Sequence, residues 1–78
     1  MKYDQDKVDE MTLALLYLVT TESEFGARAG RSFDMATMQR LHEKGWIDDP
    51  KTKSLSLLIT KEGFERSKDL FRESFGEE

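Results

Sequence analysis

The sequence has no cysteine, one proline, one histidine and no apolar run longer than the stretch at residues 13–19. Without cysteine, disulfides, cysteine-type zinc sites and thiol nucleophiles are excluded, and the composition agrees with a reducing compartment. The apolar run is too short to cross a membrane, and the N-terminus lacks the basic-then-apolar order of a signal peptide. We therefore expect a cytoplasmic protein.

The chain is 78 residues long and is also short of positive charge. This length gives room for one modest core, so we expect a single domain spanning residues 1–78. The formal net charge of -4 counts against nucleic-acid binding, because neutralisation of phosphates supplies most non-specific affinity. The middle of the chain differs, since residues 28–53 carry six basic and four acidic side chains.

The first strong pattern predicts a helix that begins near Asp4 or Asp6, either of which can cap it. Apolar residues then recur at three- and four-residue spacing, which is typical of the buried face of a helix. We expect this helix to be the centre of the core. The repeating positions are Val8, Met11, Leu15 and Leu18, widened by Leu13, Leu16, Tyr17 and Val19.

Residues 22–31 follow, and Gly26 and Gly30 indicate a loop or a frayed turn with at most a short turn of helix. A second helix is expected over residues 35–44, capped by Ser32 or Asp34, with Met35, Met38 and Leu41 as its apolar positions. It should end in a glycine stop at Gly45, in which Trp46 pairs with Leu41.

The remaining sequence predicts a hairpin and a third helix. Trp46 and Ile47 form one short strand, residues 48–53 are dense in turn formers, and residues 54–59 alternate with Leu55, Leu57 and Ile59 on one face. Thr60 is the expected cap of a final helix, whose apolar residues are Phe64, Leu70, Phe71 and Phe75. The expected fold is α+β, with three main helices and a two-stranded antiparallel hairpin between the second and the third.

Two stretches carry a family resemblance: LHEKGWI at residues 41–47 and LLITKEGF at residues 57–64. Together they resemble the helix-wing-helix half of small bacterial winged-helix transcriptional regulators, related to the multiple-antibiotic-resistance and phenolic-acid-decarboxylase regulators. The resemblance implies a recognition helix at residues 35–44 and a wing at residues 48–53. The whole chain also looks like an uncharacterised family of small bacterial proteins that share DKVDEM, LALLYL, LHEKGWI and DPK.

If the domain binds DNA, the exposed side of the second helix should carry the contacts. Ala36, Thr37, Gln39, Arg40, Glu43 and Lys44 are expected on that side. Glutamine and arginine read base edges, so Gln39 and Arg40 would face bases while basic residues nearby contact phosphates. The predicted set is Arg28, Arg31, Thr37, Gln39, Arg40, Lys44, Lys51 and Lys53. The plainer interpretation is a solvated surface.

The class we favour is a non-enzymatic module that binds a protein partner or a second copy of itself. So small a core cannot hold every apolar residue, and the surplus would be available to a partner. This surplus consists of Tyr3, Tyr17, Phe25, Phe33, Leu58 and Phe75.

Catalysis has little support in the sequence. His42 is the sole histidine, and its neighbour Glu43 points to a different side of a helix, so the two form neither a metal site nor a dyad. Gly26 and Gly30 lack the strand-before and helix-after context of a phosphate-binding loop. We expect no enzyme activity, no cofactor, no metal and no small-molecule ligand.

Overall fold

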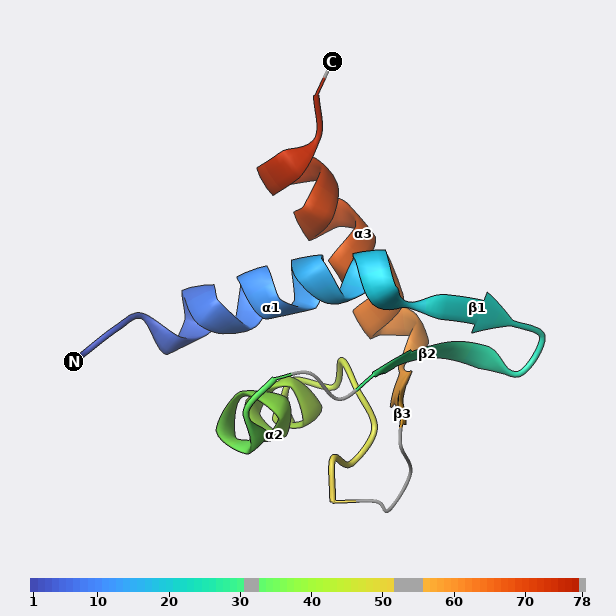
Figure 1. Ribbon diagram of the computed structural model, residues 1–78, viewed down its shortest axis with the longest axis horizontal. Helices are drawn as coiled ribbons and strands as arrows, with labels where there is room; N and C mark the ends of the chain where they lie inside the picture. The colour runs from blue at the N-terminus through green and yellow to red at the C-terminus, as the bar shows by residue number, and fades with distance from the viewer. Residues whose placement is uncertain (31–32, 52–55, 78) are drawn as a thin grey trace.

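The computed structural model describes residues 1–30, 33–51 and 56–77. In this part of the chain three helices and a three-stranded antiparallel sheet confirm the α+β class (Figure 1). The elements in chain order are α1 (Gln5–Val19), β1 (Thr21–Ser23), β2 (Gly26–Gly30), α2 (Met35–Glu43), β3 (Ser56–Ile59) and α3 (Lys61–Phe75).

Each helix begins where a side chain accepts a hydrogen bond from the backbone N–H three residues later. The caps are Asp4, Asp34 and Thr60, and Asp4 rather than Asp6 caps α1. Such caps satisfy donors that the first turn of a helix leaves without a backbone partner. The predicted helix starts are therefore confirmed at the level of the hydrogen bond.

The predicted position of the hairpin is wrong. The hairpin of regular strands is β1–β2, which lies between α1 and α2, in the stretch expected to be a loop or a turn of helix. Gly26 supplies the positive φ of 116° that this tight turn requires. Strand β2 then pairs with β3, so the sheet order is β1-β2-β3.

The strand expected at residues 46–47 is reduced to one isolated antiparallel bridge between Ile47 and Ile59. The backbone N–H of Asp48 donates to the carbonyl oxygen of Leu58 at 2.9 Å beside this bridge. Ile47 and Asp48 therefore do lie antiparallel to Leu58 and Ile59, but this first arm is too short to be a strand. Leu55, expected on the inner face of this hairpin, lies outside the described residues, whereas Leu57 and Ile59 are buried as expected.

The end of α2 is the glycine stop that the sequence indicates. Gly45 has a positive φ of 80°. Its N–H donates to the carbonyl oxygen of His42 at 2.9 Å, and the N–H of Trp46 donates to the carbonyl oxygen of Leu41 at 3.0 Å. Thr60 joins this stop to α3, because its hydroxyl donates to the carbonyl oxygens of Gly45 at 2.7 Å and Trp46 at 3.1 Å. The two motifs of the family resemblance thus meet in space.

The core lies where α1 meets the sheet, α2 and α3. Helix α1 makes its most extensive contact with α3, which crosses it in Figure 1, and also touches α2 and β2. Its central position is as predicted. The buried apolar side chains are Leu13, Ala14, Leu16, Ala27, Ala29, Met38, Leu41, Ile47, Leu57, Ile59 and Leu70.

The buried side of α1 is not the one that the spacing predicted. Leu13 and Leu16 are 0% and 1% exposed, whereas Leu15 is 41% and Leu18 is 64% exposed. Val8 and Met11 are half-buried. The predicted stripe therefore forms an outer side of α1, because α2, α3 and the sheet together cover only the opposite part of the helix.

No helix in the described ranges is both long enough and apolar enough to pass through a membrane.

Candidate interaction surface

Two of the residues predicted to contact DNA point at α1. The Nε of Arg40 donates to the two carboxylate oxygens of Asp9 at 2.9 and 3.0 Å, and the Nζ of Lys44 donates to Asp9 Oδ2 at 2.8 Å. Asp9 is 0% exposed. Because a buried carboxylate without partners is strongly unfavourable, these two cations hold it in the core and join the two helices.

Hydrogen bonds extend this ion cluster in both directions. The Nη2 of Arg40 donates to the hydroxyl of Thr37 at 3.1 Å, and that hydroxyl donates to Asp34, the cap of α2, at 2.8 Å. At the other end, Lys44 donates to Asp6 at 3.0 Å and lies 5.5 Å from the centre of the Trp46 ring. The cluster thus ties the start and the end of α2 to α1.

The cluster also changes the proton affinity of its members. The hydrogen bond of Arg40 to Asp9 raises the pKa of Arg40 above its ordinary value. The separate hydrogen bond of Lys44 to Asp9 is the main cause of the raised pKa of Lys44. The pKa of Asp34 is lowered, first by the hydroxyl of Thr37 and then by the backbone N–H of Thr37, both of which donate to the carboxylate. Each shift favours the charged form found in the cluster.

The other predicted contacts on α2 are only partly available. Thr37 was expected to be exposed, which is wrong, because it is 2% exposed and bonded to its own cap. Gln39 is half-buried, and its Oε1 is buried without a hydrogen-bond partner in the described part of the chain. Ala36 and Glu43 are exposed as expected.

Basic residues outside α2 complete the predicted set. Arg28 on β2 and Lys51 in the loop after α2 are both exposed, while Arg31 and Lys53 lie outside the described residues. Among the described members of the set, the two basic side chains on α2, Arg40 and Lys44, are paired with carboxylates of α1.

His42 has a partner near the end of α2. Its Nδ1 lies 3.0 Å from the carbonyl oxygen of Ile47, a contact that joins α2 to the bridge with β3 when Nδ1 carries the proton. Among the described residues no three histidine, aspartate or glutamate side chains come together in a way that would hold a metal ion.

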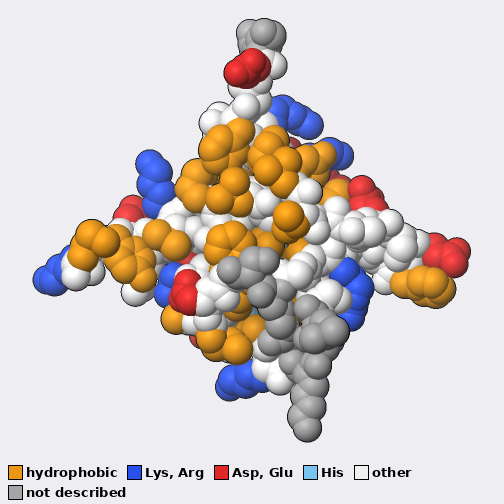
Figure 2. All heavy atoms as spheres, viewed as in Figure 1, with side chains coloured by type: hydrophobic (Ala, Val, Ile, Leu, Met, Phe, Trp, Pro, Cys, Tyr) orange, Lys and Arg blue, Asp and Glu red, His pale blue; other side chains and the backbone are white. Residues whose placement is uncertain are grey.

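The outer side of α1 carries several exposed apolar side chains. We call it the α1 face and define it as Val8, Met11, Leu15, Leu18 and Val19, of which the last three are 41%, 64% and 55% exposed. Figure 2 shows apolar side chains gathered over α1 and, on the same side of the molecule, over the C-terminal part of α3. Single exposed apolar residues are ordinary, but a continuous apolar helix face is the usual mark of an interaction site.

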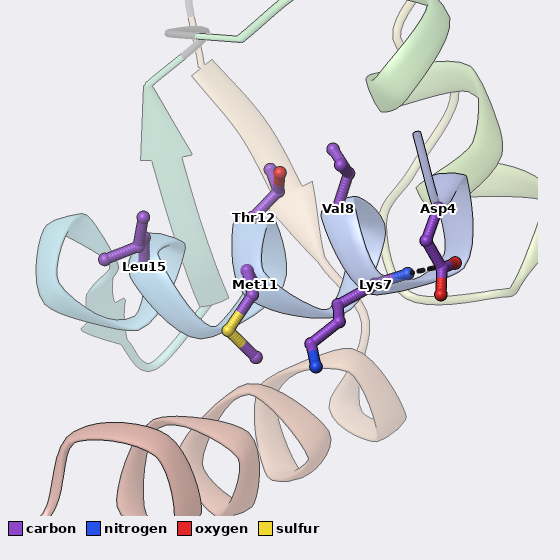
Figure 3. Close-up of a pocket in the computed structure, with 6 residues that line it drawn as sticks. All are labelled: Asp4, Lys7, Val8, Met11, Thr12 and Leu15. Carbon is purple, nitrogen blue, oxygen red and sulfur yellow. Dashed lines mark hydrogen bonds between the residues drawn. The ribbon is translucent and has the colours of Figure 1, made fainter. Parts of the chain in front are cut away.

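An open groove of about 390 Å³ runs along the α1 face. Figure 3 shows its residues on successive turns of the helix, with Met11 and Lys7 directed toward α3 and with Val8 and Thr12 directed toward the sheet. The lining residues are Asp4, Lys7, Val8, Met11, Thr12 and Leu15.

The surplus apolar residues named from the sequence all stay outside the buried core. Tyr3, Phe25, Phe33 and Phe75 are exposed, whereas Tyr17 and Leu58 are half-buried. Tyr17 is stacked at a tilt against Phe71, with ring centres 5.4 Å apart, and Phe71 in turn contacts Phe75 at 5.2 Å. The expectation that so small a core leaves aromatic surface uncovered is confirmed.

Sequence reasoning missed two features. It did not identify Asp9 as the partner of Arg40 and Lys44, and it assigned the α1 face to the core. One signal in the sequence could have indicated the α1 face. Helix α1 is apolar on nearly all sides, and two helices and a small sheet cannot cover all of that apolar surface.

Comparisons with known proteins place the chain among its relatives. A family model described as "Domain of unknown function (DUF6429)" matches residues 4–77. An "Uncharacterized protein y4hR" of Sinorhizobium fredii is 52% identical over 75 residues, which are 96% of this chain and 97% of the relative. No solved structure matches the chain. The expected likeness to an uncharacterised bacterial family is confirmed, and the chain belongs to the DUF6429 family.

Proposed function

We propose that this chain is a non-enzymatic protein-interaction module whose binding surface is the α1 face. The observation that carries the proposal is the exposure of Leu15 and Leu18 in the C-terminal half of a helix whose opposite side is the centre of the core. Burying apolar area contributes roughly 25 cal/mol per Å², so a second protein that covers this face gains directly from the exposed side chains. We expect the domain to act in the cytoplasm.

The shape we attribute to the scaffold is winged-helix-like. Support comes from the glycine stop at the end of α2, the return of the chain from Ile47 to β3 and the bonds of Thr60 to the α2 stop. These are the features that carried the family resemblance. The hairpin β1–β2 between α1 and α2 is not part of the features that carried the resemblance.

The proposal includes no catalysis. His42 is engaged with Ile47, and the charged cluster around Asp9 is occupied by its own partners. A general acid or base needs a polar atom within reach of a substrate. Three of the six residues that line the groove along the α1 face are apolar, and of its polar residues Asp4 already caps α1.

The test is photocrosslinking in the native host with a benzophenone amino acid at position 15. The matched control carries the same group at Glu65, an exposed position on α3. We expect a discrete adduct of higher mass from position 15 and none from position 65. Adducts that are absent from both positions, or equal at both, would contradict the proposal.

DNA binding by α2 and residues 48–53 is the alternative. Substitution of Arg40, which the sequence suggests as the test, does not suit this structure. Arg40→Ala is a poor probe, because Arg40 holds a buried carboxylate and its loss would disturb the fold. Arg28 and Lys51 are exposed and suit the purpose. Binding to random duplex DNA that weakens steeply with salt and is reduced by Arg28→Ala or Lys51→Ala would favour DNA over protein.

A further inference from the structure

We infer that the occupant of the α1 face is a second copy of this chain, bound so that the two α1 helices lie antiparallel across a two-fold axis. This inference rests on the proposed function, which it makes specific by naming the partner. Three properties of the face support it: its spacing, its charges and its extent.

The spacing of the face is that of a helix that pairs with another helix. Val8, Met11, Leu15 and Leu18 are separated by three, four and three residues, which is the a and d pattern of a heptad repeat. Two heptads are too few for an independent coiled coil, but they are enough for one helix pair between globular subunits. In an antiparallel pair centred between Met11 and Leu15, each of these two residues faces the other in the second copy.

The same alignment places Val8 opposite Leu18, so the whole seam is apolar and self-complementary. A two-fold interface requires this property, because the same surface serves both subunits. The inner flanks of the seam carry Thr12 and Ala14, which are small, uncharged and buried. Pairing of two copies therefore brings no like charges together along the middle of the seam.

One charge near the start of the face, that of Lys7, favours the antiparallel orientation. Lys7 is exposed near the start of α1, whereas the last turn of α1 contains no basic residue. The carboxyl end of a helix carries partial negative charge and is stabilised by a cation. The antiparallel alignment sets Lys7 opposite Val19 of the second copy, so each helix receives at its end a cation that its own last turn lacks. The same alignment sets the exposed Asp4 opposite Glu22 of the second copy.

The side of the molecule that carries the α1 face is broad enough for a dimer interface. The molecule measures 35 × 32 × 18 Å, so it is broad and thin, and one broad side carries α1 and the apolar end of α3. A specific interface covers about 800 Å² on each partner, and a side of 35 × 32 Å is broad enough to hold one. Phe75, 46% exposed near the end of α3, lies where it can extend the contact beyond α1.

The first experiment is the mass of the purified chain in solution, by sedimentation equilibrium up to about 1 mM. We expect twice the monomer mass of 9.1 kDa, with dissociation in the micromolar range. Leu15→Glu and Leu18→Glu should each return the monomer while circular dichroism stays that of a folded domain. Phe25→Glu and Met35→Glu are the matched controls, because they change exposed apolar residues elsewhere (85% and 54% exposed) and should leave the dimer intact.

The second experiment fixes the orientation, and it uses the absence of cysteine from the chain. Val8→Cys and Leu18→Cys variants are oxidised separately and as a mixture. The antiparallel pair predicts a disulfide chiefly in the mixture, between position 8 of one copy and position 18 of the other. Disulfides formed chiefly within each separate sample would show parallel helices and would overturn the arrangement.

The inference would be overturned by a monomer at every concentration. It would also be overturned by a dimer that survives both glutamate variants at the α1 face but dissociates with Phe25→Glu or Met35→Glu. The proposed function fails separately. A monomer in solution combined with a crosslink from position 15 to a different protein keeps the interaction module and rejects the second copy, whereas the absence of any specific crosslink rejects the module itself.

Discussion

Asp9 of α1 is fully removed from solvent, and its two carboxylate oxygens accept hydrogen bonds from the Nε of Arg40 on α2 at 2.9 and 3.0 Å. This relationship explains why a short, acidic protein places basic residues on its second helix. The cations of α2 neutralise a carboxylate in the core, so their role in this structure is to stabilise the fold.

Replacing Asp9 by Asn should therefore destabilise the domain. The change leaves Arg40 and Lys44 without the anion that they surround, and loss of one member of a buried ion pair costs about 3 kcal/mol. Urea denaturation measures the effect. Asp6→Asn is the matched control, because Asp6 also contacts Lys44 but its side chain is 83% exposed. Asp6→Asn should change the free energy of unfolding by less than about 0.5 kcal/mol. Equal effects of the two variants would contradict the role of Asp9 as a stabilising buried carboxylate.

The cap of α2 predicts a stability that depends on pH. Hydrogen bonds from the hydroxyl and the backbone N–H of Thr37 lower the pKa of Asp34 below its ordinary value of 3.8. A group whose pKa is lower in the folded state stabilises the fold above its unfolded pKa, and this stabilisation is lost as the pH falls through the folded pKa.

The matched variant is Asp34→Asn, because asparagine also caps helices well but does not titrate. The wild-type chain should be more stable than Asp34→Asn above pH 3.8, and the difference should close as the pH falls below that value. Thermal unfolding from about pH 2 to about pH 7 measures this difference. If the difference between the two chains is the same at every pH, the carboxylate of Asp34 is not the cause.

The sequence was informative wherever one local hydrogen bond decides the structure. The caps at Asp4, Asp34 and Thr60 and the stop at Gly45 are set by residues within four positions of each other, so their chemistry can be recognised without knowing the fold. All three helices were predicted for this reason.

The hairpin β1–β2 was missed because its strand signal is weak. The inward residues of β2 are Ala27 and Ala29, which are small and have low strand propensity, and glycines stand at both ends of the strand. Pairing with β3, which is distant in sequence, is what orders this segment. Alternation of alanine and arginine between glycines gave no local reason to expect it.

The covered side of α1 was missed for a different reason. Apolar residues surround this helix on nearly every side, so periodicity alone does not decide which part of it meets the sheet. The position of Asp9 settles the matter only after its partner Arg40 is known. The residues on which the candidate site depends, Leu15 and Leu18, therefore needed the tertiary structure.

The two sides of α1 should differ in their contribution to stability. Leu13→Ala removes a side chain that is 0% exposed and should cost about 2–5 kcal/mol, because it leaves a cavity in the core. Leu18→Ala removes one that is 64% exposed and should cost less than about 0.5 kcal/mol in the monomer. Urea denaturation at low concentration, below dimer formation, makes the comparison. A larger loss from Leu18→Ala would mean that the α1 face is the true core side.

Gly63 tests the junction that links the end of α2 to the start of α3. A Cβ atom at this position would collide with the carbonyl group of Trp46, whose oxygen also accepts the hydroxyl of Thr60 at 3.1 Å. In an open helical position, replacement of glycine by alanine stabilises a helix by about 1 kcal/mol. Here the collision should reverse the sign, with a net loss of about 1–3 kcal/mol.

Lys61→Ala, an exposed change in the same turn of α3, is the control and should stay within about 0.5 kcal/mol of the wild-type chain. Because the helix propensity of alanine and the collision act in opposite directions, the sign of the Gly63→Ala effect is itself the measurement. A stabilised variant would contradict the close contact between Gly63 and the carbonyl group of Trp46. It would therefore also contradict this junction between the end of α2 and the start of α3.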